Sequence, residues 1–438
     1  MPRPNILYIH SHDTGRYVQP YGYAIPTPGI QRLAEEGVLF RQAFCAGPTC
    51  SPSRAALLTG MCPHSAGMIG LAHRGFHLRD FSRHIVHTLK RAGYRTVLAG
   101  VQHVAKSAGD IGYDTVMPRG AGARPAEQAA AEFLRSRPAQ PFFLDVGFIE
   151  THRLSPPQDG YFTSPGPSGD ARYVRPPAPL PDTPETRRDM ADFIAAAGIL
   201  DRKMSVVLGA LGEAGLAGNT LVICTTDHGI AFPQMKCNLT DHGLGVMLIM
   251  RGPGGFDGGK VCDAMVSHID VFPTVCALAD IEAPPWLQGR SLLPLVRGEV
   301  QRINDEIFGE VTYHAAYEPM RAVRTERWKY IRRFDGRRRR VMPNTDDGLS
   351  RKLWLRHGWR DMPIAEEYLF DLMFDPNEAH NLAGDPTYGD VLMDMRARLE
   401  RWMVRTDDPL LRGPVPAPAG ARVNDVDGLS PYEPEKTL

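Results

Sequence analysis

Five short and continuous apolar runs stand out in the first 300 residues of the chain. They lie at residues 6–9, 96–99, 142–148, 221–225 and 246–250. Runs of this length, bounded by polar residues, predict strands that are buried on both faces of a sheet. Segments with helical periodicity lie between them, at residues 29–37, 53–58, 126–135, 186–214 and 269–279. Alternation of strands and helices predicts an α/β fold, with a large mixed, mostly parallel sheet sandwiched by helices.

The pattern changes after Gly298. Three runs at residues 307–312, 320–324 and 328–332 predict antiparallel strands, and a helix is expected at 391–404. We therefore predict two domains, residues 1–300 and a smaller C-terminal α+β domain, residues 301–438. The tail from Pro414 is rich in Pro, Gly and Asp and is expected to lie extended on the surface. The proline-rich stretch at 156–184 predicts either an insertion that lines a pocket mouth or a plain surface loop.

The composition of the chain argues against nucleic acid and membranes as its binding partners. The chain has 438 residues and a formal net charge of +0, so long-range attraction to nucleic acid or to a membrane is not expected. It has no apolar run of about 18 residues and no basic and apolar leader, which predicts a cytoplasmic protein without a membrane span. Seven unevenly spaced cysteines argue against a disulfide framework. The oligomeric state cannot be read from the sequence, and a homo-oligomer is compatible with it.

Side chains that bind metals or carry protons follow four of the predicted strands. In open α/β sheets, loops at the carboxyl ends of the strands gather the polar groups of the site. Each of these side chains also has an ordinary structural interpretation, since a single histidine near a strand end is often a satisfied core residue. The residues that follow the strands are His12 with Asp13, His103, His152, and Asp227 with His228.

The segment from Cys50 to Gly60 carries the most specific signal. Cys50-Ser-Pro-Ser-Arg54 runs into Ala-Ala-Leu-Leu-Thr-Gly60, which places Cys50 at the start of a helix and Arg54 on the same side. A helix N-terminus offers free N–H donors and Arg54 offers a fixed cation, so a tetrahedral oxyanion could be held against residue 50. This geometry suits sulfate or phosphate esters.

Cys-x-Pro-Ser-Arg followed by Leu-Thr-Gly resembles the signature of the sulfatases, which have the alkaline-phosphatase-like fold. The resemblance implies that Cys50 is oxidised to formylglycine by a formylglycine-generating enzyme. It also implies a mechanism in which the hydrated aldehyde attacks sulfur with one hydroxyl, and the other hydroxyl then loses its proton to expel sulfate.

The resemblance further implies one divalent metal ion, held by residue 50 and by two pairs of side chains after strands. The family uses an Asp-Asp pair and an Asp-Asn pair with calcium. This chain departs from that pattern, with His12 beside Asp13 and His228 beside Asp227. Imidazole is a poor calcium ligand, so manganese or zinc are alternatives to calcium.

Other pocket residues are assigned by the same resemblance. The family's Lys-x-His motif keeps its histidine as His103, but Val101 stands at the lysine position. His152 corresponds to a general acid, and Lys236 lies at the expected distance after Asp227 to reach the bound anion. A loop histidine and a solvated loop lysine are the plain alternatives. Weaker candidates for substrate contacts are His77, Arg153, Asn238, Glu310 and His314.

Similarity extends over almost the whole chain and is greatest to the heparan N-sulfatase branch of the family. It includes Gly289-Arg-Ser-Leu-Leu-Pro294, Asp375-Pro-Asn-Glu378 and Thr406-Asp-Asp-Pro409. The leading interpretation is a metal-dependent sulfuric ester or sulfamate hydrolase that acts on a small-molecule or sugar sulfate. One alternative is a phosphonate monoester or phosphodiester hydrolase of the same superfamily. Another is an inactive homologue that binds sulfate or a glycan.

Overall fold

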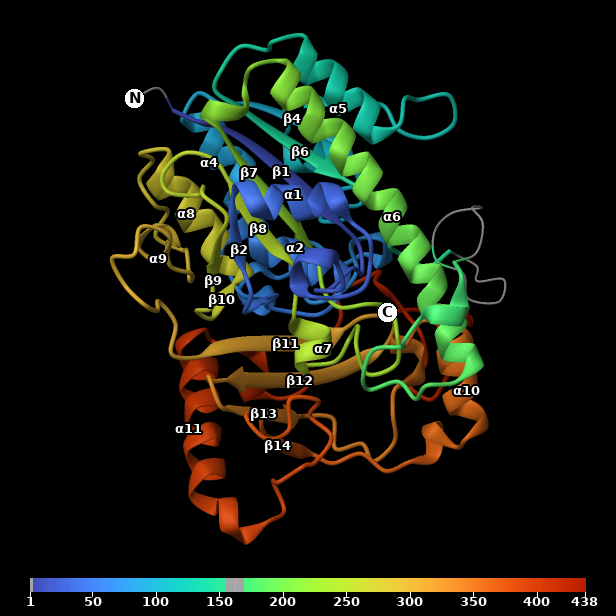
Figure 1. Ribbon diagram of the computed structural model, residues 1–438. Helices are drawn as coiled ribbons and strands as arrows, with labels where there is room; N and C mark the ends of the chain where they lie inside the picture. The colour runs from blue at the N-terminus through green and yellow to red at the C-terminus, as the bar shows by residue number, and fades with distance from the viewer. Residues whose placement is uncertain (1–2, 155–161, 163–168) are drawn as a thin grey trace.

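An eight-stranded sheet forms the centre of the computed structural model, which describes residues 3–154, 162 and 169–438 (Figure 1). In spatial order its strands are β5 (Thr115–Val116), β4 (Arg95–Gly100), β6 (Phe142–Gly147), β1 (Asn5–Ser11), β7 (Thr220–Thr226), β8 (Leu248–Arg251), β2 (Val38–Phe40) and β9 (Lys260–Cys262). Strands β4, β6, β1 and β7 pair in parallel. Strand β8 runs antiparallel to both of its neighbours. The sheet is therefore mixed and mostly parallel, as predicted.

Both faces of this sheet are buried. Along β1, Ile6 and Tyr8 belong to one hydrophobic cluster, and Leu7 and Ile9 belong to another. Successive side chains of a strand point to opposite faces, so the continuous apolar run covers both. The first cluster packs α2 (Cys50–Thr59), α4 (Ile85–Arg91) and α8 (Val271–Leu278) on one face, and the second packs α1 (Pro28–Glu36), α5 (Ala126–Arg135) and α6 (Pro184–Glu213) on the other. This arrangement confirms the predicted fold class.

A second, four-stranded antiparallel sheet lies below the first in Figure 1. It contains β11 (Ile307–Tyr313), β12 (Tyr317–Arg324), β13 (Trp328–Arg333) and β14 (Glu367–Asp371), and α11 (Gly389–Arg405) packs against one face. The remaining elements are α3 (Pro63–Ala66), α7 (Asp241–Leu244), α9 (Leu293–Val296), α10 (Leu349–Arg356), the pair β3 (Ala43–Phe44) and β10 (Val266–Ser267), and the pair β15 (Arg422–Val423) and β16 (Lys436–Thr437). The domain division at residue 300 stays a prediction.

A buried network of charged side chains joins the small sheet to α3. Arg321 of β12 donates to Asp408 with Nε at 2.5 Å and Nη2 at 3.0 Å. Glu310 of β11 accepts from the backbone N–H of His64 at 2.5 Å and also contacts the His64 ring. All four side chains are at most 2% exposed. Partial loss of such a network would leave an uncompensated buried charge, so these residues help to fix α3 against the small sheet.

Two segments were expected at the surface, the tail from Pro414 and the stretch at 156–184. The tail differs from that expectation, and part of the stretch lies outside the described residues. The tail does not simply lie extended on the surface. It forms the β15–β16 pair, and its residues Ala421, Val423 and Asn424 are buried. In the stretch at 156–184, residues 156–161 and 163–168 lie outside the described part of the chain, and the described ones do not line the cavity that contains Cys50. Among the described residues, none of the helices combines the length and apolarity needed to span a bilayer.

Candidate functional site

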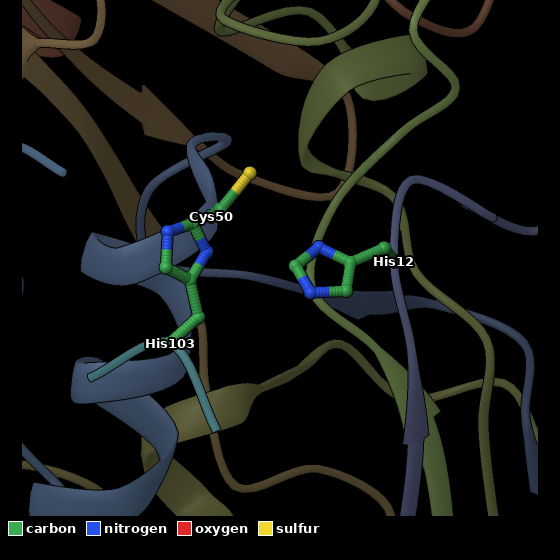
Figure 2. Close-up of side chains that lie close together, drawn as sticks. All are labelled: His12, Cys50 and His103. Atoms are coloured by element: carbon green, nitrogen blue, oxygen red, sulfur yellow. The ribbon is translucent and has the colours of Figure 1, made fainter. Parts of the chain in front are cut away.

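Cys50 is the first residue of α2, and its side chain is buried next to two imidazoles. Figure 2 shows the rings of His12 and His103 facing each other beside it. The Sγ atom lies 3.4 Å from Nε2 of a third histidine, His228. Burial raises the pKa of the Cys50 thiol well above its usual value, although the positive charge of Lys236 acts in the opposite direction. An unmodified Cys50 is therefore a neutral thiol at neutral pH and a poor nucleophile.

Potential metal ligands converge on Cys50 from the ends of β1 and β7. One group of four, His12, Asp13, Cys50 and Asp227, has its ligand atoms within 4.8 Å of one another. His12 Nδ1 lies 3.1 Å from Asp227 Oδ2, and His228 Nε2 lies 3.4 Å from Asp13 Oδ1. The neighbouring parallel strands β1 and β7 end at the same edge of the sheet, which brings the two His and Asp pairs together.

The bonding of these side chains fits a cation. Asp13 Oδ1 and both ring nitrogens of His12 are buried and have no hydrogen-bond partner among the described residues. Nδ1 of His228 lies 3.0 Å from the Gly229 carbonyl oxygen, to which it can only donate, so in the corresponding neutral tautomer the lone pair is on Nε2, which points toward Cys50 Sγ. Burial opposes ionisation of Asp227, but His228, Arg54 and His12 lower its pKa well below the usual range. Such a donor set suits a divalent metal ion.

The guanidinium of Arg54 lies against Asp227 and not at the wall of the cavity. Its guanidinium donates to Asp227 Oδ2 at 3.0 Å and to the Ser11 carbonyl at 2.8 Å, and it contacts the His10 ring. The side chain is only 1% exposed and does not line the cavity. Arg54 therefore orients and neutralises Asp227. Direct contact between Arg54 and a bound anion stays a prediction.

Lys236 bridges the metal-ligand candidates and the C-terminal part of the chain. Its Nζ lies 3.0 Å from Asp13 Oδ2 and 3.0 Å from Asp346 Oδ2. Burial would lower the pKa of Lys236, but the two carboxylates raise it well above the usual value. Lys236 is therefore a permanent cation that lines the cavity beside Cys50. Sequence reasoning missed Asp346 because no local pattern around Asn344-Thr-Asp-Asp-Gly348 marks it as a partner of a residue so far away.

Cys50 opens into a cavity of about 700 Å³ that is rich in histidine. His103 forms a 2.9 Å contact between its Nε2 and Nδ1 of His73, and the two rings stack with centroids 5.1 Å apart. The His12 ring centroid lies 5.7 Å from that of His103 and 5.5 Å from that of His152. Burial, and then the neighbouring His73, lower the pKa of His103 well below its usual value, so its ring is neutral. Lining residues that the sequence did not predict include His73, Arg74, Asp346, Arg422 and Glu435.

The weaker substrate candidates are dispersed. Of the five, His314 lines the cavity. His77 is exposed and contacts the Leu78 carbonyl, and Asn238 lines a separate cavity below α7. Glu310 belongs to the network that joins the small sheet to α3, and Arg153 pairs with Asp189. These four residues do not line the cavity that contains Cys50, and their contact with a substrate stays a prediction.

Arg153 forms a buried ion pair with Asp189, so its removal is expected to lower the stability of the fold. Its Nη1 and Nη2 donate to the two oxygens of Asp189 at 2.8 and 2.9 Å, and both side chains are at most 1% exposed. Arg153→Ala should lower the free energy of unfolding by about 3 to 5 kcal/mol, because it leaves Asp189 buried and unpaired. Urea unfolding measures this change. The control Arg172→Ala breaks an exposed pair with Asp170 and should cost less than about 1 kcal/mol. An unchanged stability with a raised KM would instead indicate substrate contact.

Comparisons with known proteins match most of the chain. The family model described as Sulfatase matches residues 4–281, and the model described as N-sulphoglucosamine sulphohydrolase, C-terminal matches residues 235–342. Human N-sulphoglucosamine sulphohydrolase is 32% identical, over 94% of this chain and 92% of its own length.

Solved structures with the same fold include enzymes of two kinds. A 2-O GAG sulfatase has a TM-score of 0.71 and 22% identity, over 95% of each chain. A phosphonate monoester hydrolase of Agrobacterium radiobacter has a TM-score of 0.67 and 20% identity, over 92% of this chain and 96% of that one. At these identities the similarity of the structures shows the fold alone. The family model and the human relative also match this chain in sequence. This chain belongs to the sulfatase family of hydrolases.

Proposed function

We propose that this protein releases sulfate from a sulfate ester or sulfamate of an amino sugar, with a formylglycine derived from Cys50 as the nucleophile. The observation that carries the proposal is the position of Cys50. It lies at a helix start and lines a cavity, and it forms one group of possible metal ligands with His12, Asp13 and Asp227. Lys236, His103 and His152 line the same cavity. A tetrahedral anion placed there would meet cations and N–H donors on several sides.

His12, Asp13, Asp227 and His228, with residue 50, would hold one divalent metal ion. Such an ion would supply positive charge that offsets the charge of the bound sulfate and favours an ionised nucleophile. Two neighbours support these ligands from outside. Arg54 fixes Asp227 through a 3.0 Å hydrogen bond, and Lys236 contacts only Oδ2 of Asp13, which leaves Oδ1 free. Supporting contacts of this kind orient metal ligands and tune their basicity.

Maturation of Cys50 would require a formylglycine-generating enzyme as a partner. The buried, neutral thiol argues that cysteine itself is not the nucleophile, since burial and the carboxylates of Asp13 and Asp227 raise its pKa more than Lys236 and Arg54 lower it. The aldehyde, once hydrated, would supply one hydroxyl that attacks sulfur and becomes sulfated, and a second hydroxyl that loses its proton, so that the aldehyde re-forms and sulfate is expelled.

Three side chains are proposed to act on the substrate. Lys236, held as a cation by Asp13 and Asp346, would bind a sulfate oxygen and compensates in part for Val101. His103 would accept or donate a hydrogen bond at residue 50 while His73 holds its ring. His152 would protonate the leaving oxygen or nitrogen from Nε2 when its ring carries both protons, because Nδ1 lies 2.6 Å from the Arg153 carbonyl oxygen, to which it can only donate.

The sugar part of the proposal is supported by the human relative, which its name describes as an N-sulphoglucosamine sulphohydrolase. Similarity to it extends over 94% of this chain, and the family model described as Sulfatase matches the region that contains Cys50. Shared sequence over this length favours a related leaving group. Function still depends on the site and not on the fold, so the substrate has to be tested directly.

A parallel rate screen tests the proposal. Protein produced together with a formylglycine-generating enzyme is assayed with nitrophenyl sulfate, N-sulfated glucosamine, a phenylphosphonate monoester and a phosphodiester. We expect the highest kcat/KM for one of the two sulfur substrates. A preference for the phosphonate or the phosphodiester would establish the alternative activity. Binding of sulfate without turnover of any of the four would identify an inactive homologue.

A further inference from the structure

A pair of polar side chains interrupts the apolar face of the large sheet that packs against α2. His10 of β1 and Asp145 of β6 are at most 2% exposed, and His10 Nε2 lies 2.9 Å from Asp145 Oδ1. The neighbouring positions on this face, Tyr8 and Phe143, belong to the hydrophobic cluster. Polar groups at such a position cost free energy unless they are hydrogen-bonded, so the partners of this pair indicate what it does.

Hydrogen bonds define which ring nitrogen of His10 carries the proton. An ionised carboxylate only accepts, so Nε2 donates to Asp145, whose other oxygen accepts from the Tyr113 hydroxyl at 2.6 Å. The second ring nitrogen, Nδ1, contacts Nη1 of Arg54, and a guanidinium only donates. Nδ1 therefore accepts from Arg54. The tautomer that Asp145 selects is the one that this contact requires.

Packing fixes the position of the His10 ring. The ring stacks on Tyr8 with centroids 4.6 Å apart, and Gly147 lies opposite His10 in the register of β1 and β6. A Cβ atom at Gly147 would lie 2.6 Å from Cε1 of the ring, so a larger residue there would displace it. The acceptor Nδ1 is therefore held at a defined place next to Arg54.

His10 determines how the guanidinium of Arg54 is held. Nη2 donates to the Ser11 carbonyl at 2.8 Å and to Asp227 Oδ2 at 3.0 Å, whereas Nη1 contacts His10. Nε has no hydrogen-bond partner among the described residues. Without His10, the guanidinium would be held through Nη2 alone. Oδ2 of Asp227 would then lose a rigid donor, while Oδ1 would keep the two backbone N–H groups that donate to it at 2.8 and 3.0 Å.

We propose that His10 is a positioning residue of the metal centre, which is kept in the required tautomer by Asp145 and acts through Arg54 to hold Asp227 in place for the ion. The inference rests on the proposed function, because it presupposes that Asp227 binds a divalent metal ion. It deepens that proposal by extending the support of the ligand to a side chain that does not line the cavity. Removal of such supporting contacts commonly weakens metal binding by about 10- to 100-fold.

Two matched variants test the inference in the full-length protein, with manganese alone as the probe. His10→Gln keeps a polar group near the place of Nε2 for Asp145, but it offers no acceptor to Arg54. His10→Asn keeps a side-chain oxygen near the place of Nδ1 for Arg54, but it does not reach Asp145. We expect His10→Gln to raise the dissociation constant for manganese by about 10- to 100-fold, and His10→Asn to raise it clearly less. Isothermal titration calorimetry on protein dialysed against a chelator measures both constants.

The control for a general loss of stability is Asp201→Asn. Asp201 is a buried carboxylate of α6 that accepts from the backbone N–H groups of Gly29 and Ile30 at 3.1 and 2.8 Å, and it does not line the cavity. This variant should lower the free energy of unfolding in urea and leave the manganese constant at the native value. His10→Leu, which offers neither a donor nor an acceptor, replaces His10→Gln if that variant does not fold.

The outcomes separate positioning from packing. A native constant in His10→Gln, an equal increase in the Gln and Asn variants, or an increase in Asp201→Asn that follows its loss of stability would overturn the inference. Native protein that binds neither manganese nor zinc would overturn it as well. Failure of the proposed function is distinguishable, because manganese binding is measured without substrate. In that case the native protein would bind the ion but cleave no sulfated substrate.

Discussion

Cys50→Ala is expected to abolish turnover of every sulfated substrate, with kcat reduced by a factor of at least about 1,000. The substitution removes the side chain from which the nucleophile would form but leaves the cavity, the cation Lys236 and the histidines in place. Substrate binding should therefore be largely retained. Initial rates with nitrophenyl sulfate and N-sulfated glucosamine measure the loss, and sulfate-dependent thermal stabilisation measures the retained binding.

A matched control separates chemistry from packing. Cys276 of α8 is also buried, but it lies in the hydrophobic cluster and not at the cavity. Cys276→Ala should lower the free energy of unfolding by about 1 kcal/mol and leave kcat unchanged. A tryptic peptide in which Cys50 remains an unmodified cysteine, in fully active protein made with the generating enzyme present, would rule out the formylglycine nucleophile.

Much of the fold could be predicted because the decisive signals are local. The run at residues 6–9 is apolar at every position, which is what a strand needs to contribute Ile6 to one core cluster and Leu7 to the other. The long helix α6 begins where Thr183 caps it and Pro184 occupies its first turn. The direction of β8 was not evident, because an apolar run carries no information on whether its partner lies parallel or antiparallel.

The metal-ligand candidates could be predicted from the sequence for the same reason. Each pair of metal-ligand candidates directly follows its own strand, so sheet topology alone brings Asp13 and Asp227 together. The rest of the site depends on contacts between distant parts of the chain. Arg74 donates to Asn424, which is 350 positions later, and no periodicity or spacing connects two such residues. Arg54 shows a related limit, since helical spacing predicts the side on which it lies but not the partner that it binds.

Two sets of contacts connect the C-terminal part of the chain to the side chains around Cys50. Lys236 stands between Asp13 and Asp346, so a single cation links the metal-ligand candidates to the C-terminal part of the chain. His73 holds His103 while its own backbone is held by Arg422 of the tail. Both connections let the C-terminal part position groups next to the nucleophile. His12 and His228, the two imidazoles that would contact a metal, take no part in these two connections. We expect these two side chains to determine which ion binds.

Removal of the metal is expected to lower activity by at least about a hundredfold, and manganese or zinc should restore it better than calcium. The expectation follows from the donors, since Asp13 and Asp227 offer oxygen but His12 and His228 offer imidazole nitrogen. Calcium prefers six to eight oxygen ligands, whereas manganese and zinc accept nitrogen readily. Dialysis against a chelator, return of each ion and elemental analysis of the purified protein measure the preference.

Exchange of the donors should change the preferred ion. The double variant His12→Asp with His228→Asn replaces both nitrogen donors by oxygen, so calcium should then give a larger increase in thermal unfolding temperature than zinc does. His84→Asn is the control, because His84 is equally buried but lies at the start of α4, away from the cavity. It should leave the order of the ions unchanged. Native protein that contains calcium alone would contradict ligation by His12 and His228, because two imidazoles in the first shell would disfavour that ion against manganese and zinc.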